Sequence, residues 1–310
     1  MTLAFVFPGQ GSQSIEMQAE LAGQYPEIQA TYAEASDELG YDLWQLAQVG
    51  PKEKLAETVV TQPVMMTAGV AAWRVWQDAG GDVPRLLAGH SLGEYTALVC
   101  AGVIEFPDAI RLIRRRAELM QQAVPAGEGG MAAILGLDDD VVLSVCKEAE
   151  EGEVVQAVNF NTPGQVVIAG AKSAVERAVE LAGKAGARRA LLLSVSVPAH
   201  SDLMKPAAQE LATALDAANL TAPSIPVISN ADVVAYESVE QIRDGLRRQL
   251  FSPVRWAETI RFMIDHGTTR IIECGPGKVL AGLNRRIDKS LSSACLDSPA
   301  SLAAALEQGT

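Results

Sequence analysis

A serine flanked by two glycines lies in this chain between an apolar run and a helical stretch. The five residues Gly89-His-Ser-Leu-Gly93 follow the short apolar run 85–88 and open segment 93–101, which is typical of a helix. In this context the pattern G-x-S-x-G predicts a strained strand-to-helix turn that exposes the serine hydroxyl. Glycines are expected because other backbone lies close to such a turn. The pattern also arises by chance at ordinary turns, but its flanking elements favour a nucleophile at Ser91.

Short apolar runs alternate with helical segments over most of the chain. Residues 3–7 are continuously apolar, as is typical of a buried parallel strand, and they end at the loop Pro8-Gly-Gln-Gly11. Helix starts, stops and periodicity predict further strands and helices, namely helices at 63–79, 107–124, from 202, 239–250 and 256–266, and strands at 85–88, 227–229 and 270–274. This alternation predicts a doubly wound α/β domain with a parallel sheet.

The pattern changes in the middle of the chain, after Pro125-Ala-Gly-Glu-Gly-Gly130. Strands and helices are predicted there in the order βαββαβ, at 131–135, 138–150, 154–159, 166–169, 172–184 and 189–195. This order is that of the ferredoxin-like motif, which can close a small core of its own. We therefore expect a ferredoxin-like small domain, residues 128–198, inserted into a large α/β domain formed by residues 1–127 and 199–310.

Composition excludes several classes of protein. The chain has 310 residues, 48% of them hydrophobic, which is enough for a large core and a second smaller one. A net charge of −13 and a pI near 4.8 argue against general nucleic-acid binding. The longest apolar stretches, such as residues 64–73, are shorter than the ~20 residues that span a bilayer. We therefore expect neither a nucleic acid nor a membrane as partner.

The cysteines and the first residues predict a cytoplasmic protein. The four cysteines are scattered and form no C-x-x-C pair, so buried free thiols are expected rather than a disulfide framework or a zinc site. Residues 1–7 lack a basic segment before the apolar run and lead directly into Pro8. We interpret them as a first strand and not as a signal peptide.

A serine nucleophile needs a base, and the chain has only three histidines. His90 adjoins Ser91 and would project differently from such a turn, which favours a structural role. His266 ends a predicted helix just before Gly267, where a cation or a solvated side chain is usual. His200 lies in loop 196–202 at the start of the next helix, where the helix dipole favours a neutral imidazole. Elimination favours His200 as the base, with an ordinary surface histidine as the alternative.

One arginine of the predicted helix 107–124 lies on the wrong face. At about 100° per residue, Arg116 falls among the apolar side chains of Ala109, Leu112, Leu119 and Ala123. A buried guanidinium needs an anion. An internal salt bridge or a side chain that reaches back to solvent is slightly favoured. The functional alternative is a bidentate clamp for a substrate carboxylate.

A set of motifs occurs in order along nearly the whole chain, namely Phe7-Pro-Gly-Gln-Gly11, Gly89-His-Ser-Leu-Gly-Glu94, Arg116, Asn159-Phe-Asn-Thr-Pro-Gly164, Val197-Pro-Ala-His200, Gln249, Pro253-Val254 and Gly275-Pro-Gly-Lys278. Together these motifs resemble those of one family, the malonyl-CoA:acyl carrier protein transacylases of bacterial fatty-acid synthesis. The resemblance implies a hydrolase-like α/β domain with a parallel sheet and a nucleophile elbow, together with the ferredoxin-like insertion.

The resemblance also implies the substrates and the main catalytic residues. Ser91 would be the nucleophile, His200 the base, and Gln249 the residue that orients His200 in place of a carboxylate. Arg116 would bind the malonyl carboxylate. A malonyl group would pass from malonyl-CoA to Ser91 and then to the phosphopantetheine thiol of acyl carrier protein, in a ping-pong sequence.

Further positions follow from the same resemblance. The backbone amides of Gln10 and Leu92 would form the oxyanion hole. Val197 and Ala199 lie where related polyketide acyltransferases vary with the extender unit. No metal and no cofactor are implied.

Acyl carrier protein is acidic in this family's pathway, so it would dock on basic side chains. The candidates are Lys184, Arg188, Arg189, Arg285 and Arg286, although each one taken singly is better explained as a solvated side chain.

Other functions are less well supported by the sequence. A serine esterase or thioesterase shares the G-x-S-x-G pattern but gives no reason for Arg116 or for the missing triad acid. A non-catalytic carrier-binding protein would not need nucleophile, base and clamp together. The segment Gly275-Pro-Gly-Lys278 lacks the spacing of a phosphate-binding loop. His90 and Glu94 could suggest a metal pair, but no third ligand is apparent.

Overall fold

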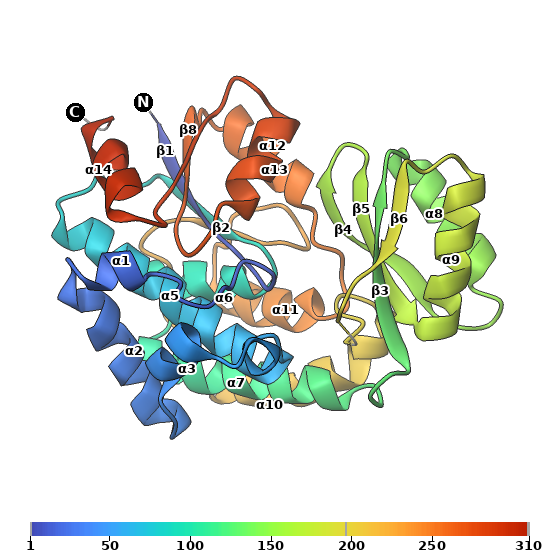
Figure 1. Cartoon of the computed structure of the whole chain (residues 1–310), viewed down its shortest axis with the longest axis horizontal. Helices are drawn as coiled ribbons and strands as arrows, with labels where there is room; N and C mark the ends of the chain where they lie inside the picture. The colour runs from blue at the N-terminus through green and yellow to red at the C-terminus, as the bar shows by residue number, and fades with distance from the viewer. Residues whose placement is uncertain (1, 196, 309–310) are drawn as a thin grey trace.

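The structure is a computed structural model that describes residues 2–195 and 197–308. Figure 1 shows two sheets: a parallel sheet between two layers of helices, and an antiparallel sheet to one side. This is a mixed α/β fold. Met1 and Ser196, which begin the predicted first strand and the predicted loop before His200, lie outside the described residues.

The parallel sheet has five strands in the order β7-β2-β1-β8-β9. All four strand pairs are parallel. The bounds are β1 Leu3–Phe7, β2 Leu86–Gly89, β7 Val227–Ile228, β8 Arg270–Glu273 and β9 Ser292–Cys295. The central strand β1 is buried along its whole length, which explains its unbroken run of apolar residues.

Helices cover both faces of the parallel sheet. Phe5 and Phe7 of β1 point into the larger core, while Ala4 and Val6 point into a second core on the opposite face. The helices of the larger core and its rim are α1 Ala19–Ala22, α2 Pro26–Leu39, α3 Leu43–Val49, α4 Lys52–Leu55, α5 Thr58–Asp78, α6 Leu92–Cys100, α7 Phe106–Gln122, α10 Lys205–Ala217, α11 Val239–Gln249 and α14 Pro299–Glu307. The opposite face is covered by α12 Trp256–Asp265 and α13 Val279–Ile287. The parallel strands therefore lie between two apolar layers.

The antiparallel sheet has four strands in the order β4-β5-β3-β6. In chain order its elements are β3 Gly129–Leu135, α8 Asp139–Ala149, β4 Val155–Thr162, β5 Gln165–Ala171, α9 Lys172–Lys184 and β6 Arg189–Leu192. One face packs on α8 and α9 around a separate core. The other face presents Met131, Val158 and Val167 toward the chain segment that carries Ala199. This second face forms one wall of the candidate site.

The two sheets are joined through the edge strand β4. The backbone N–H of Phe160 donates to the carbonyl of Val254 at 2.9 Å, and the N–H of Val254 donates to the carbonyl of Val158 at 2.8 Å. Val254 lies in the segment between α11 and α12, so β4 is hydrogen-bonded to the same segment that follows Gln249. This contact fixes the antiparallel sheet beside the carboxyl ends of the parallel strands.

Most predicted elements are present, with two informative differences. The helix predicted to begin at Pro63 begins at Thr58, so that Pro63 lies inside α5. Nearly every residue of α5 is buried, and this packing outweighs the hydrogen bond that proline cannot donate. The strand predicted at 189–195 ends at Leu192, because Ser194 and Val195 leave the ladder and line a cavity instead. No described helix is long and apolar enough to cross a membrane.

Candidate active site

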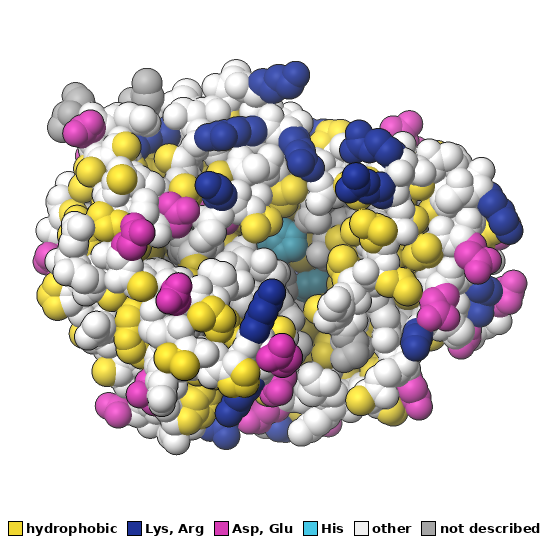
Figure 2. All heavy atoms as spheres, in the orientation of Figure 1, with side chains coloured by type: hydrophobic (Ala, Val, Ile, Leu, Met, Phe, Trp, Pro, Cys, Tyr) yellow, Lys and Arg dark blue, Asp and Glu magenta, His cyan; other side chains and the backbone are white. Residues whose placement is uncertain are grey.

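A cavity of about 380 Å³ lies between the antiparallel sheet and the carboxyl ends of the parallel strands. Figure 2 shows the hollow near the centre of the face, with histidine side chains visible inside it. The walls bring together residues that are far apart in the sequence, among them Gln10, Gln62, His90, Ser91, Leu92, Arg116, Met120, Met131, Asn159, Val167, Val197, Ala199 and His200. Most of the predicted site residues therefore line one cavity.

Ser91 stands on a sharp turn between β2 and α6. Its φ of 53° and ψ of −112° lie outside the usual regions for a residue with a side chain. Two side chains bind the peptide groups on either side of Ser91. The N–H of Ser91 donates to Asn230 Oδ1 at 2.8 Å, and Gln249 Nε2 donates to the carbonyl of Ser91 at 2.9 Å. Both ends of the strained residue are thus fixed by side chains from distant elements.

The two glycines around Ser91 are required by close packing. A Cβ on Gly93 would meet the carbonyl oxygen of Phe7 at 2.1 Å, and a Cβ on Gly89 would meet the backbone of Gly93 at 1.8 Å. A Cβ on Gly9 would meet the carbonyl oxygen of His90 at 2.6 Å. The turn after β2 is therefore packed directly against the loop that follows β1.

His200 lies in the same cavity and contacts the Ser91 hydroxyl. Its Nε2 lies 2.8 Å from Ser91 Oγ, and its Nδ1 lies 2.7 Å from the backbone carbonyl oxygen of Gln249. A carbonyl only accepts, so the ring proton is on Nδ1 and the lone pair of Nε2 faces the hydroxyl. Gln249 thus contacts His200 through its backbone carbonyl, while its side chain contacts Arg116, Ser91 and Glu94.

Two causes keep His200 neutral. Burial of the ring and the nearby positive charge of Arg116 lower the pKa of His200 to about 3. A neutral ring was expected from the helix dipole, whereas burial is the larger cause. A neutral imidazole beside a serine hydroxyl can accept its proton during nucleophilic attack.

Arg116 is 1% exposed and has no carboxylate among the described residues as an ion-pair partner. NH1 donates to Gln62 Oε1 at 2.6 Å, and NH2 donates to Gln249 Oε1 at 2.9 Å. NH2 also lies 3.3 Å from Ser91 Oγ, and the guanidinium lies over the ring of Tyr95. Each terminal nitrogen carries two hydrogens, so each keeps one that no glutamine oxygen accepts. The internal salt bridge that the sequence slightly favoured is absent from the described contacts.

The backbone amides of Gln10 and Leu92 belong to residues that border the same cavity as Ser91. Leu92 is the first residue of α6, so its N–H is one of those that a helix leaves without an intrahelical acceptor. The positive end of the helix dipole is directed at the same place. The N–H of Leu92 is therefore available to an acceptor beside Ser91, and Gln10 borders the cavity in which the resemblance expects its amide to act.

Glu94 was named from the sequence only in the matching motif and as half of a rejected metal pair, and no role at the site was predicted for it. Glu94 is fully buried behind Ser91 and accepts hydrogen bonds from Tyr236 Oη, from Gln249 Nε2 at 2.7 Å and from the N–H of Asn230 at 3.2 Å. Burial raises the pKa of Glu94 to about 7, although these hydrogen bonds act to lower it. A single charged residue in the otherwise apolar segment of α6 was the available signal.

The other residues singled out from the sequence lie outside the group formed by Ser91, His200 and Arg116. His90 Nε2 contacts Asn161 Oδ1 at 2.9 Å, in keeping with a structural role. His266 stacks on Phe262 at the exposed end of α12. The described residues contain no cluster of three metal-ligating side chains. Val197 and Ala199 border the cavity, as the resemblance implied.

Comparisons with known proteins agree with one another. Residues 4–304 match the model of the acyl transferase domain family. The chain is 56% identical over 305 residues to the malonyl CoA-acyl carrier protein transacylase of Salmonella typhimurium, covering 98% of this chain and 99% of that protein. It also resembles the solved acyl carrier protein S-malonyltransferase of Vibrio cholerae, with a TM-score of 0.96, 57% identity and coverage of 98% and 99%. A malonyl-transacylase solved in complex with a type II PKS acyl-carrier protein gives a TM-score of 0.98, with 55% identity and coverage of 99% and 100%.

The close packing at the serine turn gives a first prediction. Gly93→Ala places a methyl group against the backbone of β1, which cannot move without disturbing the sheet. We expect it to lower the free energy of unfolding by about 3 kcal/mol or more. Gly282→Ala is the matched control, because Gly282 is an exposed position of α13 with no atom within 4 Å of the added Cβ. The control should gain about 0.5–1 kcal/mol in urea unfolding. Equal stability of the two variants would contradict the packing argument.

The tautomer of His200 gives a second prediction. Because its pKa is lowered to about 3, the ring should remain neutral as the pH falls from about 8 to about 5. Nitrogen NMR of histidine-labelled protein should show one ring with a protonated Nδ1 and a bare Nε2 throughout this range, assigned by its loss in His200→Ala. A titration of this ring with its midpoint near the ordinary value of about 6.5 would refute the assignment.

Proposed function

This chain belongs to the acyl transferase domain family and, within it, to the malonyl-CoA:acyl carrier protein transacylases, and from that premise we propose how its residues carry out the reaction. The enzyme transfers a malonyl group from malonyl-CoA to the phosphopantetheine thiol of acyl carrier protein, supplying malonyl carrier protein for fatty-acid synthesis. The proposal rests on one observation: His200 and Arg116 both lie within hydrogen-bond distance of the Ser91 hydroxyl oxygen.

The first half-reaction loads the serine. Ser91 Oγ attacks the thioester carbonyl of malonyl-CoA while His200 Nε2 accepts the hydroxyl proton. The resulting oxyanion accepts hydrogen bonds from the amides of Gln10 and Leu92. The carbon–sulfur bond then breaks, CoA leaves as the thiol with the proton held by His200, and a malonyl ester remains on Ser91.

The second half-reaction reverses these steps with a different thiol. His200 accepts the proton of the phosphopantetheine thiol, whose sulfur attacks the ester carbonyl. The same two amides stabilise the second oxyanion. Collapse breaks the bond to Ser91 Oγ, which regains a proton from His200, and malonyl carrier protein leaves. No net proton or electron is consumed, in keeping with a thioester-to-thioester exchange.

Arg116 selects the acyl group. NH1 keeps one hydrogen that no printed contact uses, and the second hydrogen of NH2 points at Ser91 Oγ in the free protein. These two hydrogens can donate to the two oxygens of the malonyl carboxylate once Ser91 carries the acyl group. Binding the carboxylate also gives the buried Arg116 a directly hydrogen-bonded anion, which it has from none of the described residues in the free protein. An acetyl group offers no such partner.

The finer features of the fold belong to the same proposal. The turn from β2 through Ser91 to α6 is interpreted as a nucleophile elbow of hydrolase type, which its positive φ supports. Residues 128–198 are interpreted as a ferredoxin-like insertion between residues 1–127 and 199–310, which the strand order and the separate core of α8 and α9 support. The four free cysteines favour the reducing environment of the cytoplasm.

The carrier protein must reach the cavity with its phosphopantetheine arm. Figure 2 shows Lys and Arg side chains gathered beside the hollow. The basic candidates for docking an acidic partner remain Lys184, Arg188, Arg189, Arg285 and Arg286. Arg286 is occupied in part, because it donates to Gln165 of β5 at 3.0 Å. Charge complementarity of this kind acts chiefly on the association rate.

A hydrolase is the second candidate, and intact-mass measurement separates the two. We predict that malonyl-CoA alone leaves a lasting malonyl adduct on the protein, that added holo carrier protein removes it, and that Ser91→Ala never acquires it. A hydrolase would release free malonate and show no lasting adduct. Observation of that result would rule out the transferase.

Removal of the Arg116 guanidinium tests the selection of the acyl group. We expect Arg116→Ala to lower kcat/KM for malonyl-CoA by about 100- to 1,000-fold, the range for losing a buried charge-assisted contact, and to lower acetyl transfer much less. Arg115→Ala is the matched control, because Arg115 is on the same helix but exposed and paired with Glu210. Equal losses for both acyl groups would show that Arg116 does not bind the carboxylate.

A further inference from the structure

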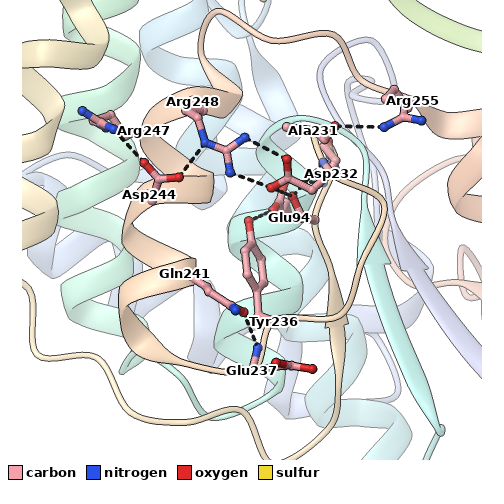
Figure 3. Close-up of polar contacts among 12 residues, drawn as sticks. Glu94, Ala231, Asp232, Tyr236, Glu237, Gln241, Asp244, Arg247, Arg248 and Arg255 are labelled. Carbon is pink, nitrogen blue, oxygen red and sulfur yellow. Dashed lines mark hydrogen bonds and ion pairs between the residues drawn. The ribbon is translucent and has the colours of Figure 1, made fainter.

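Glu94 lies in the first turn of α6, one residue beyond the glycine that follows Leu92, and it does not border the cavity. Its side chain is fully buried. Tyr236 donates to Oε1, while Gln249 Nε2 and the N–H of Asn230 donate to Oε2. Figure 3 shows Tyr236 reaching toward Glu94 from the loop that follows β7. The mechanism above assigns this carboxylate no role.

Two of the groups that donate to Glu94 belong to the residues that hold Ser91. Asn230 accepts from the N–H of Ser91 with its side-chain oxygen, and its Nδ2 donates to the carbonyl of Gly89 at 2.6 Å. Gln249 donates to the carbonyl of Ser91. Glu94 therefore contacts both of the residues that bind the peptide groups of Ser91.

The same carboxylate fixes which way the Gln249 amide points. Nε2 of Gln249 faces two groups that only accept, the Glu94 carboxylate and the Ser91 carbonyl. Oε1 of Gln249 faces Arg116, which only donates. A reversed amide would set donor against donor and acceptor against acceptor. Loss of the anchor on Glu94 would therefore disturb the placement of Arg116.

The residues that contact Glu94 are held together by a second set of ion pairs. Arg248 of α11 donates to both oxygens of Asp232, at 2.8 and 2.6 Å, and to Asp244 at 2.6 Å. Asp232 lies in the loop between Asn230 and Tyr236, and Arg248 precedes Gln249. Figure 3 shows Arg248 between the two aspartates. These ion pairs thus link the loop that carries Asn230 and Tyr236 to helix α11, which carries Gln249.

We propose that Glu94 is a positioning residue for the transfer reaction: through Asn230 and Gln249 it holds the strained peptide of Ser91, and through the Gln249 side chain it aims Arg116 at the acyl carboxylate. The inference rests on the proposed function, since it gives Glu94 its effect through residues that this function uses. It assigns a task to a residue that touches neither substrate nor reacting atoms.

A carboxylate suits this position better than an amide. Three donors converge on Glu94 from two sides, and a carboxylate offers an acceptor oxygen to each side. A glutamine of the same shape has one oxygen, and it can meet Gln249 and Asn230 only by turning its NH₂ group to Tyr236, whose hydroxyl oxygen then accepts. The neutral amide oxygen holds the Gln249 amide less strongly than a carboxylate does, so reversal of the Gln249 amide costs less.

The test is the malonyl-to-acetyl preference of Glu94→Gln, measured as Ser91 acylation rates at about pH 8, where Glu94 is mostly ionised. We expect the malonyl rate to fall by about 10- to 100-fold, the range for hydrogen bonds to charged groups, and the acetyl rate to fall less. The ratio of the two rates should therefore drop. A purely structural role would lower the melting temperature and leave this ratio unchanged.

The chain offers a matched control in Glu273→Gln. Glu273 is equally buried, at the end of β8, and accepts from the N–H groups of Leu280 and Ala281 without contacting the site. The Glu273→Gln variant should be less stable than the wild type and keep the wild-type ratio of malonyl to acetyl acylation rates. If Glu94→Gln does not fold, Tyr236→Phe removes one donor without changing the shape and should lower the ratio by a smaller factor.

The outcomes separate the two proposals. Wild-type protein that takes up no malonyl group would overturn both. Wild-type protein with the expected malonyl preference, together with an unchanged ratio in Glu94→Gln, or in Tyr236→Phe where only that variant folds, would overturn the role of Glu94 alone.

Discussion

The buried charge of Arg116, to which no carboxylate of the described residues is hydrogen-bonded, is the constraint that organises the site. A guanidinium with 1% exposure would ordinarily be paired with a carboxylate, because burial of a lone charge costs several kcal/mol. Here its hydrogen bonds go to two glutamine oxygens and a serine hydroxyl, all of them neutral, and its guanidinium lies over the ring of Tyr95. The Glu94 carboxylate acts on this charge only from a distance, across the Gln249 amide. We propose that this charge binds a substrate anion, and it also helps to keep His200 neutral.

The same cavity depends on backbone strain that the fold must hold. Ser91 has a positive φ, its flanking glycines touch the loop after β1, and both of its peptide groups are bound by side chains from the carboxyl end of β7 and from α11. The parallel sheet brings these segments to one edge, and β4 closes the cavity from the other side through its bond to Val254. Layer packing and catalysis are therefore linked: elements that bury the core also determine where the hydroxyl points.

Sequence reasoning succeeded where the signal was local. The apolar run before Gly89 predicted β2, helical periodicity placed Arg116 on a buried face, and the order of elements between residues 129 and 192 is as expected. Elimination among three histidines chose His200, which does contact Ser91. Asn230 and Tyr236 could not be predicted, because their partners lie about 140 residues away and no periodic pattern marks them. The helix start at Thr58 was missed because tertiary packing overrides the usual preference of proline for a first turn.

The most direct test of this account is a crystal structure of the enzyme trapped with a malonyl group on Ser91. We predict that both oxygens of the malonyl carboxylate accept from the terminal nitrogens of Arg116, that the ester carbonyl oxygen faces the amides of Gln10 and Leu92, and that His200 stays within reach of the ester oxygen. A carboxylate directed to solvent, with Arg116 still bound only to Gln62 and Gln249, would contradict the claim that this buried charge is kept for the substrate.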